Sequence, residues 1–401
     1  MNILIIHNKL PYPPKDGGAI AVLNMATSLA DAGHKVTLLC FNTKKHHYNP
    51  ERIPEEIRKK IRFKTVLLDN IVKPHKAISN LLFSRKPYIA TRFFSKNFSK
   101  ALINELNTDY DLVQIEGLYM CHYIPVIRKY SEAKITYRAH NIESEIWQRT
   151  TQITKDPFKK VYLKILSKRL FRFEKSTLNK YDGLIPISER DLKQLNNLGN
   201  KKPSLAIPTG ININNYPKAQ KPLPEKNLFF IGALDWAPNQ EGLLWFIDKV
   251  WPSILSKFPD LKLHIGGRNA PTSLIEKLKH TNNVVFHGEL EDAQQFYHNN
   301  GIMVVPILSG SGIRIKILEG MAYGKIITTS SIGAEGIGIS HKENIFIANT
   351  KEEYIKSIQD ILQNLNNEEL DSISSCARKF ITLNYSNSSL ADKLYTFYKE
   401  I

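Results

Sequence analysis

Apolar runs and segments with helical spacing alternate along the chain in the order typical of an α/β protein. The uncharged run at residues 3–6 predicts a fully buried first strand. Residues 19–32 have the spacing of a helix that ends at Gly33, and residues 34–41 predict a second strand. A strand, a loop with paired glycines, a helix and a strand form a βαβ unit, so the pattern predicts a parallel sheet.

The same alternation continues to the end of the chain, apart from residues 44–110, which have little pattern. Further strands are predicted at residues 111–114, 134–137, 183–188, 227–231, 262–265, 283–286, 301–306 and 325–329. Helices are predicted at residues 157–181, 241–257 and 313–323, and at about 350–365 and 367–401, and a small loop is predicted at 333–336.

Length and composition predict two domains. A chain of 401 residues is too long for one ordinary core, and residues 212–224, which are proline-rich from 217 onward, form a linker. We therefore expect an amino-terminal domain at residues 1–210 and a carboxy-terminal domain at 211–385, each with its own doubly wound parallel sheet.

Charge separates the two halves. Residues 1–210 hold 36 Lys and Arg against 18 Asp and Glu, whereas residues 211–401 hold 19 against 20, so the net charge of +17 lies in the first half. This asymmetry predicts an anionic partner for the first domain, either a membrane surface or nucleic acid. No apolar run is long enough for a membrane span, the first residues lack a signal peptide, and three scattered cysteines fit a reducing cytoplasm.

Two basic segments are candidates for that partner. Residues 44–110 mix cations with aromatic residues, a composition found in membrane interfaces and in nucleic-acid sites, but also in ordinary helices with solvated faces. Residues 157–181 predict a basic amphipathic helix, which either lies on a membrane surface or docks on the sheet with a basic outer face.

Residues 310–329 carry the clearest chemistry. A small-residue loop leads into the predicted helix at 313–323, whose amino terminus offers N–H groups and a positive dipole to an anion such as phosphate. Arg314 in the first turn and Lys316 in the next half-turn fit a diphosphate, and Glu319 lies on the same face, where it can accept hydrogen bonds from ribose hydroxyls. Ordinary turn chemistry with a solvated charged face is the alternative, but the helix is apolar on most sides, which favours burial.

The stretch Gly-Ser-Gly-Ile-Arg-Ile-Lys-Ile-Leu-Glu at residues 310–319 resembles the carboxy-terminal signature of the retaining glycosyltransferases of family 4, glycosyl transferases group 1. The resemblance implies the GT-B fold, with two Rossmann-like domains facing across a cleft and a terminal helix, residues 386–401, that crosses back to the first domain. In the family motif Glu-x7-Glu the second Glu binds the nucleotide ribose and matches Glu319. The first lies near the donor sugar, and here Ser311 replaces it.

The resemblance also assigns roles outside the helix. Gly17 and Gly18 match the glycine loop that approaches the donor phosphates, with a plain tight turn as the alternative. His140 occupies the position of a family histidine near the reacting anomeric carbon, although a histidine after a strand is often structural. Nucleotide-sugar contacts are expected at Gly17, Gly18, Gly232, His287, Ser311, Gly312, Ile313, Arg314, Lys316 and Glu319, and catalytic roles at His140, Arg314 and Lys316.

Two further features of the sequence bear on how the donor phosphates are bound. Members carry cations after the first strand of the second domain, but residues 232–239 contain none, so we expect Arg314 and Lys316 to supply the charge from the helix. The Asp109-Tyr-Asp111 triplet lies at the start of a predicted strand, the wrong end of a parallel sheet for a metal site, which favours a metal-independent enzyme without a cofactor.

The sequence therefore predicts a cytoplasmic glycosyltransferase, peripheral on the inner membrane, in cell-surface polysaccharide or glycoconjugate synthesis. Its donor is a UDP- or GDP-sugar and its acceptor a glycan or a lipid-linked acceptor. A sugar-nucleotide epimerase of the same fold, a nucleic-acid-binding protein and a non-catalytic relative are the alternatives. No nucleic-acid motif is present, so we expect no nucleic-acid partner.

Overall fold

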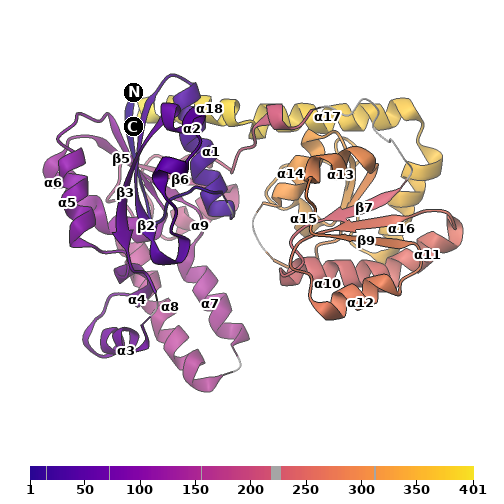
Figure 1. Cartoon of the computed structure of the whole chain (residues 1–401), viewed down its shortest axis with the longest axis horizontal. Coiled ribbons are helices and arrows are strands. Elements are labelled where there is room, and N and C mark those ends of the chain that lie inside the picture. The colour runs from indigo at the N-terminus through magenta and orange to yellow at the C-terminus, as the bar shows by residue number, and fades with distance from the viewer. Residues whose placement is uncertain (15, 72, 155, 218–226, 311–312) are drawn as a thin grey trace. The chain divides into compact units, whose positions relative to one another are not determined.

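The structure is a computed structural model that describes residues 1–14, 16–71, 73–154, 156–217, 227–310 and 313–401. The chain forms two compact units, each built on one sheet (Figure 1). The first unit contains Met1–Gly210 together with Leu390–Ile401, and the second contains Ile211–Ser389.

The sheet of the first unit has six parallel strands in the order β3-β2-β1-β4-β5-β6. Chain order reverses on the two sides of β1, which pairs with both β2 and β4, so the carboxyl ends of these central strands form the switch point where α/β proteins bind ligands. The strands are β1 (Asn2–His7), β2 (Lys35–Thr43), β3 (Ile61–Leu68), β4 (Leu112–Glu116), β5 (Lys134–Ala139) and β6 (Gly183–Pro186).

Helices surround this sheet. They are α1 (Gly17–Asp31), α2 (Glu55–Lys60), α3 (Pro74–Phe83), α4 (Tyr88–Thr91), α5 (Lys96–Glu105), α6 (Ile124–Tyr130), α7 (Glu143–Ile153), α8 (Pro157–Thr177), α9 (Glu189–Asn197) and α18 (Asn387–Glu400), with short 3-10 turns at Lys44–His46, Pro50–Arg52 and Leu118–Tyr123. Of these helices, α3 and α4 lie beyond one end of the sheet (Figure 1). From Leu390 onward α18 packs on the first unit, where Leu394 and Phe397 join the apolar cluster of Ile3 and Ile5.

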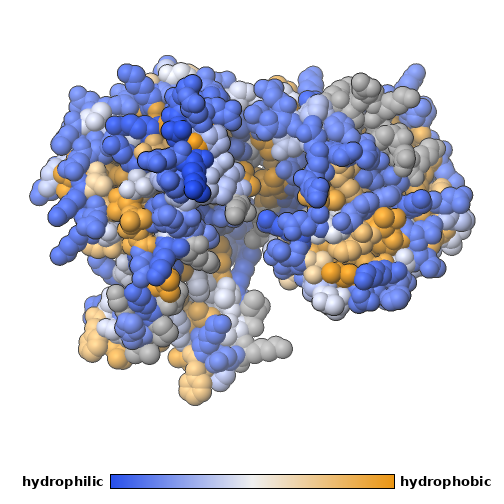
Figure 2. Space-filling model, in the orientation of Figure 1, coloured by the Kyte–Doolittle hydropathy of each residue, from blue (hydrophilic) through white to orange (hydrophobic). Residues whose placement is uncertain are grey.

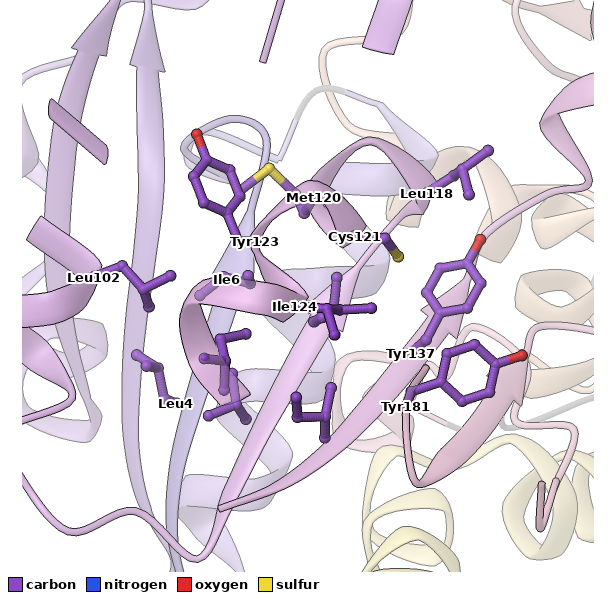
Figure 3. Packing of buried hydrophobic residues seen from close by; sticks show 14 of the residues in the cluster. Leu4, Ile6, Leu102, Leu118, Met120, Cys121, Tyr123, Ile124, Tyr137 and Tyr181 are labelled. Carbon is purple, nitrogen blue, oxygen red and sulfur yellow. The ribbon is translucent and has the colours of Figure 1, made fainter. Parts of the chain in front are cut away.

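The uninterrupted apolar run of β1 is explained by burial on both faces. Leu4 and Ile6 face one side of the sheet and pack with Leu102 of α5 and with Ile124 of α6 (Figure 3). Successive strand residues point to opposite faces, so the residues between them, such as Ile5, enter the other core.

The sheet of the second unit also has six parallel strands, in the order β12-β11-β10-β7-β8-β9. Its strands are β7 (Leu228–Ile231), β8 (Leu263–Gly266), β9 (Val284–Gly288), β10 (Ile302–Val305), β11 (Ile326–Thr329) and β12 (Phe346–Ile347). Its helices are α10 (Ala237–Trp245), α11 (Trp251–Lys257), α12 (Thr272–Lys279), α13 (Ala293–Asn299), α14 (Ile315–Ala322), α15 (Ser331–Ala334), α16 (Lys351–Gln359) and α17 (Asn367–Tyr385), with a 3-10 turn at Ile213–Asn215 and π-helical turns at Phe246–Val250 and Asp360–Asn364.

The predicted fold class, two α/β units with parallel sheets, is confirmed, but several local predictions were wrong. The helix predicted at about 367–401 is two helices, α17 and α18, separated by Ser386 in an extended conformation. Strand β3 was missed because it is an edge strand whose polar residues are exposed. The helix predicted at 241–257 is interrupted by the π-helical turn Phe246–Val250, since Pro252 has no N–H to continue the α-helical pattern. The loop predicted at 333–336 overlaps α15, which Ser330 caps by accepting a hydrogen bond from the Gly333 N–H.

Across the described ranges, none of the helices combines the length and the apolarity that a bilayer crossing requires.

Candidate functional site

Two polar clusters, one in each unit, contain most of the polar candidate residues. The α14 cluster consists of Arg314, Lys316 and Glu319, at the beginning of α14 in the second unit. The β4–β5 cluster consists of Glu116, Arg138 and His140, at the carboxyl ends of two neighbouring strands of the first unit.

Arg314 lies just before α14, not in its first turn as predicted. Its backbone is extended (φ −86°, ψ 91°), so it is the residue that precedes the helix, which begins at Ile315. The side chain is only 5% exposed, and its guanidinium carbon lies 5.3 Å from the centre of the Trp236 ring. Burial lowers the pKa of Arg314, against an opposing effect of Glu335. Arg314 is thus a largely desolvated cation held against an aromatic ring.

The residues just before Arg314 complete this end of the helix. Ser311 and Gly312, two predicted donor contacts, lie outside the described residues. Ile313 is partly buried against Gly336. Gly310 has φ +103°, a conformation that favours glycine, and a methyl group there would lie 3.3 Å from a guanidinium nitrogen of Arg314. Glycine at this position therefore serves both the turn and the space around Arg314.

Lys316 extends from α14 to the loop that follows β7. Its Nζ donates to Asn239 Oδ1 at 2.7 Å and lies 4.3 Å from the centre of the Phe230 ring. Burial, with the nearby charge of Arg314, lowers the pKa of Lys316 to about 7. No carboxylate of the described residues forms an ion pair with it, so its ammonium group has only a neutral amide and a ring as close partners.

Gly232, another predicted donor contact, lies directly beside that ammonium group. A methyl group at position 232 would lie 2.7 Å from Lys316 Nζ and 3.0 Å from Asn239 Nδ2, so a larger residue would displace the lysine. The ammonium group of Lys316 therefore lies against the segment at 232–239, which includes the first residues of α10 and has no cation of its own.

Glu319, one helical turn after Lys316, is held by Tyr216, while Tyr297 contacts the backbone of Lys316. Tyr216 Oη donates to Glu319 Oε1 at 3.2 Å, and Tyr297 Oη donates to the Lys316 carbonyl at 3.4 Å. Burial raises the pKa of Glu319, while the Tyr216 hydrogen bond and the charge of Lys316 oppose that rise. The carboxylate is therefore fixed in position beside a cation.

His287 is not part of this cluster. His287 was predicted to follow a strand that ends at residue 286. In the structure β9 continues through Gly288, so His287 is a residue of the strand. Its Nε2 is 2.9 Å from Nδ1 of His264, and its ring lies edge-on to Phe296 at 5.2 Å between ring centres. Among the described residues its contacts are with these rings, rather than with Arg314 or Lys316.

The β4–β5 cluster is built around one buried carboxylate. Glu116 Oε2 lies 2.6 Å from His140 Nε2 and 3.6 Å from Arg138 Nη1, and the side chains of Glu116 and Arg138 are both completely buried. Burial alone raises the pKa of Glu116, but Arg138 and His140 outweigh it and bring the pKa down to about 2. Glu116 is thus ionised, and it orients the imidazole of His140 through Nε2.

The same carboxylate is linked to the carboxy-terminal helix. Glu116 Oε1 accepts a hydrogen bond from Gln114 Nε2 at 2.5 Å, and Gln114 Oε1 accepts one from the Tyr398 hydroxyl of α18. On the other side, the ring of His7 lies 6.4 Å from that of His140 between centres, and burial lowers the pKa of His7 to about 4. His7 is therefore neutral at pH 7, and its Nδ1 donates to the Lys9 carbonyl at 2.7 Å.

Gly17 and Gly18 are the first two residues of α1, which Asp16 caps by accepting a hydrogen bond from the Ala19 N–H at 3.1 Å. A methyl group at Gly17 would meet no atom of the described residues within 4 Å. Packing therefore does not require glycine there, and the backbone is open to a ligand.

Several residues of the two clusters were missed from the sequence. Trp236 and Tyr216 lie outside the helices, Asn239 lies in α10 and Tyr297 in α13, and no motif linked them to α14. Glu116 gave a usable signal, because it ends a buried strand in a parallel sheet.

Comparisons with known proteins agree with this architecture. Models of glycosyltransferase family 4 and of the glycosyl transferases group 1 match residues 15–215 and residues 225–364. The crystal structure of Anabaena HepE in complex with UDP has a TM-score of 0.67 at 14% identity, with both chains covered completely. Sucrose-phosphate synthase from Thermosynechococcus elongatus has a TM-score of 0.68 at 16% identity, over 100% of this chain and 98% of its own.

One relative is similar in sequence over nearly its whole length. It is described as an uncharacterized 44.6 kDa protein in the cps region of Klebsiella pneumoniae, and it is 25% identical over 403 residues, or 98% of each chain. The fold is that of the GT-B glycosyltransferases. The chain belongs to the family 4, or group 1, glycosyltransferases, and it is a glycosyltransferase.

Proposed function

We propose that this enzyme is a retaining, metal-independent hexosyltransferase whose donor is a nucleotide-diphosphate sugar, with a UDP-sugar as the first choice. The α14 cluster carries the proposal. It combines a buried arginine and a partly buried lysine with a carboxylate fixed by tyrosine, which is the set of groups that a diphosphate and a ribose require. The UDP complex of the HepE structure supports uridine as the nucleoside.

In this reaction the bond between the anomeric carbon and the diphosphate oxygen breaks, and the acceptor hydroxyl forms a bond to the same face of the sugar. The acceptor proton passes to the departing diphosphate. Negative charge grows on the leaving oxygens, so fixed cations lower the barrier if they lie close and are poorly solvated. Burial leaves Lys316 and Arg314 poorly solvated, and in this proposal the diphosphate lies beside them.

Glu319 has a different task in this proposal, because a carboxylate repels phosphate. Its oxygens accept hydrogen bonds from the ribose hydroxyls, while Tyr216 keeps the side chain from rotating. His140 remains the candidate for contact with the donor sugar, and Glu116 orients it.

The case for metal independence rests on the position of the acidic triplet. Asp109 and Asp111 precede β4, which begins at Leu112, and Asp111 Oδ2 accepts a hydrogen bond from the Asn2 N–H at 2.6 Å. These carboxylates therefore lie at the amino end of the sheet, opposite the edge where parallel sheets bind phosphates.

We further propose that the enzyme acts at the inner membrane surface, on a glycan or lipid-linked acceptor in cell-surface polysaccharide or glycoconjugate synthesis. The cps-region relative fits this role. Apolar side chains are exposed on two helices of the first unit, where Phe83 of α3 is 85% exposed and Phe158 of α8 is 86% exposed. Arg169 of α8 ties the two helices together by donating to the carbonyls of Asn80 and Leu81.

Cations surround this apolar surface. Figure 2 shows hydrophobic surface at the end of the first unit that carries α3 and α8, with hydrophilic surface around it. Four exposed lysines lie on α8, at positions 159, 160, 164 and 168. Aromatic side chains that enter a bilayer and lysines that stay at its anionic headgroups are the combination expected of a peripheral membrane protein.

Vesicle sedimentation tests this membrane association. We expect binding to phosphatidylglycerol vesicles that weakens with salt, little binding to phosphatidylcholine, and a large loss in the double variant Phe83→Ser/Phe158→Ser. The control is Leu383→Ser, which removes an exposed apolar residue of α17 in the second unit. Equal sedimentation of the double variant and the wild type would reject this surface.

The enzymatic proposal is tested with UDP-, GDP- and ADP-hexoses. Wild-type enzyme with EDTA present should release nucleoside diphosphate in the presence of acceptor-containing membranes, and Lys316→Met should not. Proton NMR of the product should show the anomeric configuration of the donor. An inverted product, activity that EDTA abolishes, or an epimerised nucleotide sugar in place of a transferred sugar would contradict the proposal.

A further inference from the structure

A chain of hydrogen bonds leads from the carboxy-terminal helix α18 to His140, entirely within the first unit. The Tyr398 hydroxyl donates to Gln114 Oε1, and Gln114 Nε2 donates to Glu116 Oε1 at 2.5 Å. Glu116 Oε2 in turn lies 2.6 Å from His140 Nε2. Tyr398, Gln114 and Glu116 are at most 3% exposed, whereas the His140 side chain is 15% exposed. His140 is therefore the end of the chain that a ligand can reach.

The two middle members of this chain lie where a central strand normally has apolar side chains. Strand β4 is buried along its whole length, and Leu112 packs in the same apolar cluster as Tyr398. Gln114 and Glu116 follow on the same face, because side chains alternate along a strand. An amide and a carboxylate buried there cost free energy that an apolar pair would not. The polar pair therefore indicates a function beyond packing.

The charge of Glu116 fixes the direction of each hydrogen bond in the chain. An ionised carboxylate only accepts, so Gln114 presents its amide nitrogen to Glu116 and its oxygen to Tyr398. Burial raises the pKa of Tyr398, so its hydroxyl keeps the proton that it donates. The same carboxylate accepts from the Nε2–H of His140, which leaves the lone pair of the neutral ring on Nδ1. The chain thus selects one of the two neutral tautomers of His140.

We propose that Tyr398 and Gln114 are positioning residues for the transferase reaction. They fix the carboxylate of Glu116, and with it the tautomer and orientation in which His140 offers Nδ1 to the donor sugar. The role of His140 rests on the proposed function, and the inference deepens that function by making the carboxy-terminal helix a part of the site. Tyr398 acts through Gln114 and Glu116 and does not touch the substrate.

Nitrogen NMR of enzyme labelled at histidine reads the tautomer of His140, with its signals assigned by comparison with His140→Gln. At pH 8.5, about two units above the ordinary histidine pKa of about 6.5, the wild type should show only the Nε2–H tautomer. Tyr398→Phe keeps the ring and removes the hydroxyl, and Gln114→Leu removes the amide with little change in volume. Each variant should show a mixture of both tautomers, because Glu116 keeps its charge beside Arg138 but is no longer held in one orientation.

Turnover of the nucleotide hexose that the wild type uses gives a second readout. We expect kcat to fall about fivefold in Tyr398→Phe and about tenfold in Gln114→Leu, the effect of roughly one hydrogen bond. The KM for the donor should stay within about twofold, because neither residue contacts it. The matched control is Tyr395→Phe, which removes a hydroxyl from the same helix, where the ring lies 4.8 Å from that of His34 between centres. This control should change neither the tautomer nor kcat.

The tautomer decides the inference separately from the proposed function. A pure Nε2–H tautomer in both variants, or an Nδ1–H tautomer in the wild type, overturns the inference whatever the rates are. A merely structural role would lower the melting temperature and leave the tautomer unchanged. If Gln114→Leu does not fold, Tyr398→Phe still decides the question, since it keeps the buried ring. If the wild type turns over none of the nucleotide hexoses, the proposed function fails, and the spectra still test the chain of hydrogen bonds.

Discussion

The two clusters differ in whether the protein provides an oppositely charged partner for a buried charge. In the β4–β5 cluster the carboxylate of Glu116 has a full set of protein partners, and they hold its pKa near 2. In the α14 cluster Lys316 has an amide and an aromatic ring instead of a carboxylate, and burial lowers its pKa to about 7. Removing one partner of a buried ion pair is costly because the other charge is left alone, whereas a buried cation without an ion-pair partner costs stability that a ligand restores.

The largest loss of stability is expected when the charge of Glu116 is removed. Glu116→Gln leaves Arg138 buried without its counter-charge, and we expect a loss of about 3–5 kcal/mol of local stability. Native-state hydrogen exchange of the β4 and β5 amides measures this loss. Glu132→Gln, at an exposed position of the same unit, serves as the control and should change little. If both variants exchange like the wild type, Glu116 does not hold this cluster together.

The next largest effect distinguishes the contact with the ribose from the contact with the diphosphate. Glu319→Gln should weaken UDP by about tenfold, because a neutral amide is a poorer acceptor for the ribose hydroxyls than a carboxylate. Pyrophosphate has no ribose, so its affinity should not fall. Calorimetric titrations with the two ligands make the comparison, and equal losses for both would argue against a ribose contact.

A smaller effect concerns the unliganded fold. Lys316→Met replaces a desolvated amine with an apolar side chain of similar length, and we expect the unfolding free energy to stay unchanged or to rise by about 1 kcal/mol at pH 6. Thermal unfolding without ligand measures this. A loss as large as that of Glu116→Gln would show that Lys316 is a structural cation, and the contrast between the clusters would disappear.

The smallest expected effect is the uptake of a proton by Lys316 when the diphosphate binds. The pKa of Lys316 in the free protein is about 7, so at pH 8 most molecules carry a neutral amine there. Bound diphosphate favours the ammonium form and raises this pKa. Binding should therefore take up close to one proton at pH 8 and much less at pH 6, and affinity should fall as pH rises above 7.

Calorimetry of UDP binding in HEPES and in Tris, whose ionisation enthalpies differ, counts this proton. Lys316→Met should show no uptake at either pH. Uptake that persists in the variant would assign the proton to another group.

The fold and part of the site could be predicted from the sequence. Strands buried on both faces, such as β1, leave an unmistakable apolar run, and the glycine-rich start of α14 places Arg314, Lys316 and Glu319 on one short segment. The edge strand β3 leaves no such run, since solvent covers its polar positions. Periodicity therefore finds central strands more readily than edge strands.

Contacts between segments that lie far apart in the sequence could not be predicted from local patterns. Tyr216 is 103 residues from Glu319, and Asn239 is 77 residues from Lys316, so only the folded chain brings each pair together. The helix was predicted to begin at residue 313, two residues too early, because nothing in the sequence beside Arg314 breaks a helix although its backbone is extended.

The affinity of UDP for wild-type enzyme and for Lys316→Met, measured side by side by calorimetry at pH 6.5, tests the central assignment most directly. We expect the variant to bind UDP about 10- to 100-fold more weakly while it keeps its thermal stability. Equal affinities in two equally stable proteins would contradict the assignment of the α14 cluster to the diphosphate.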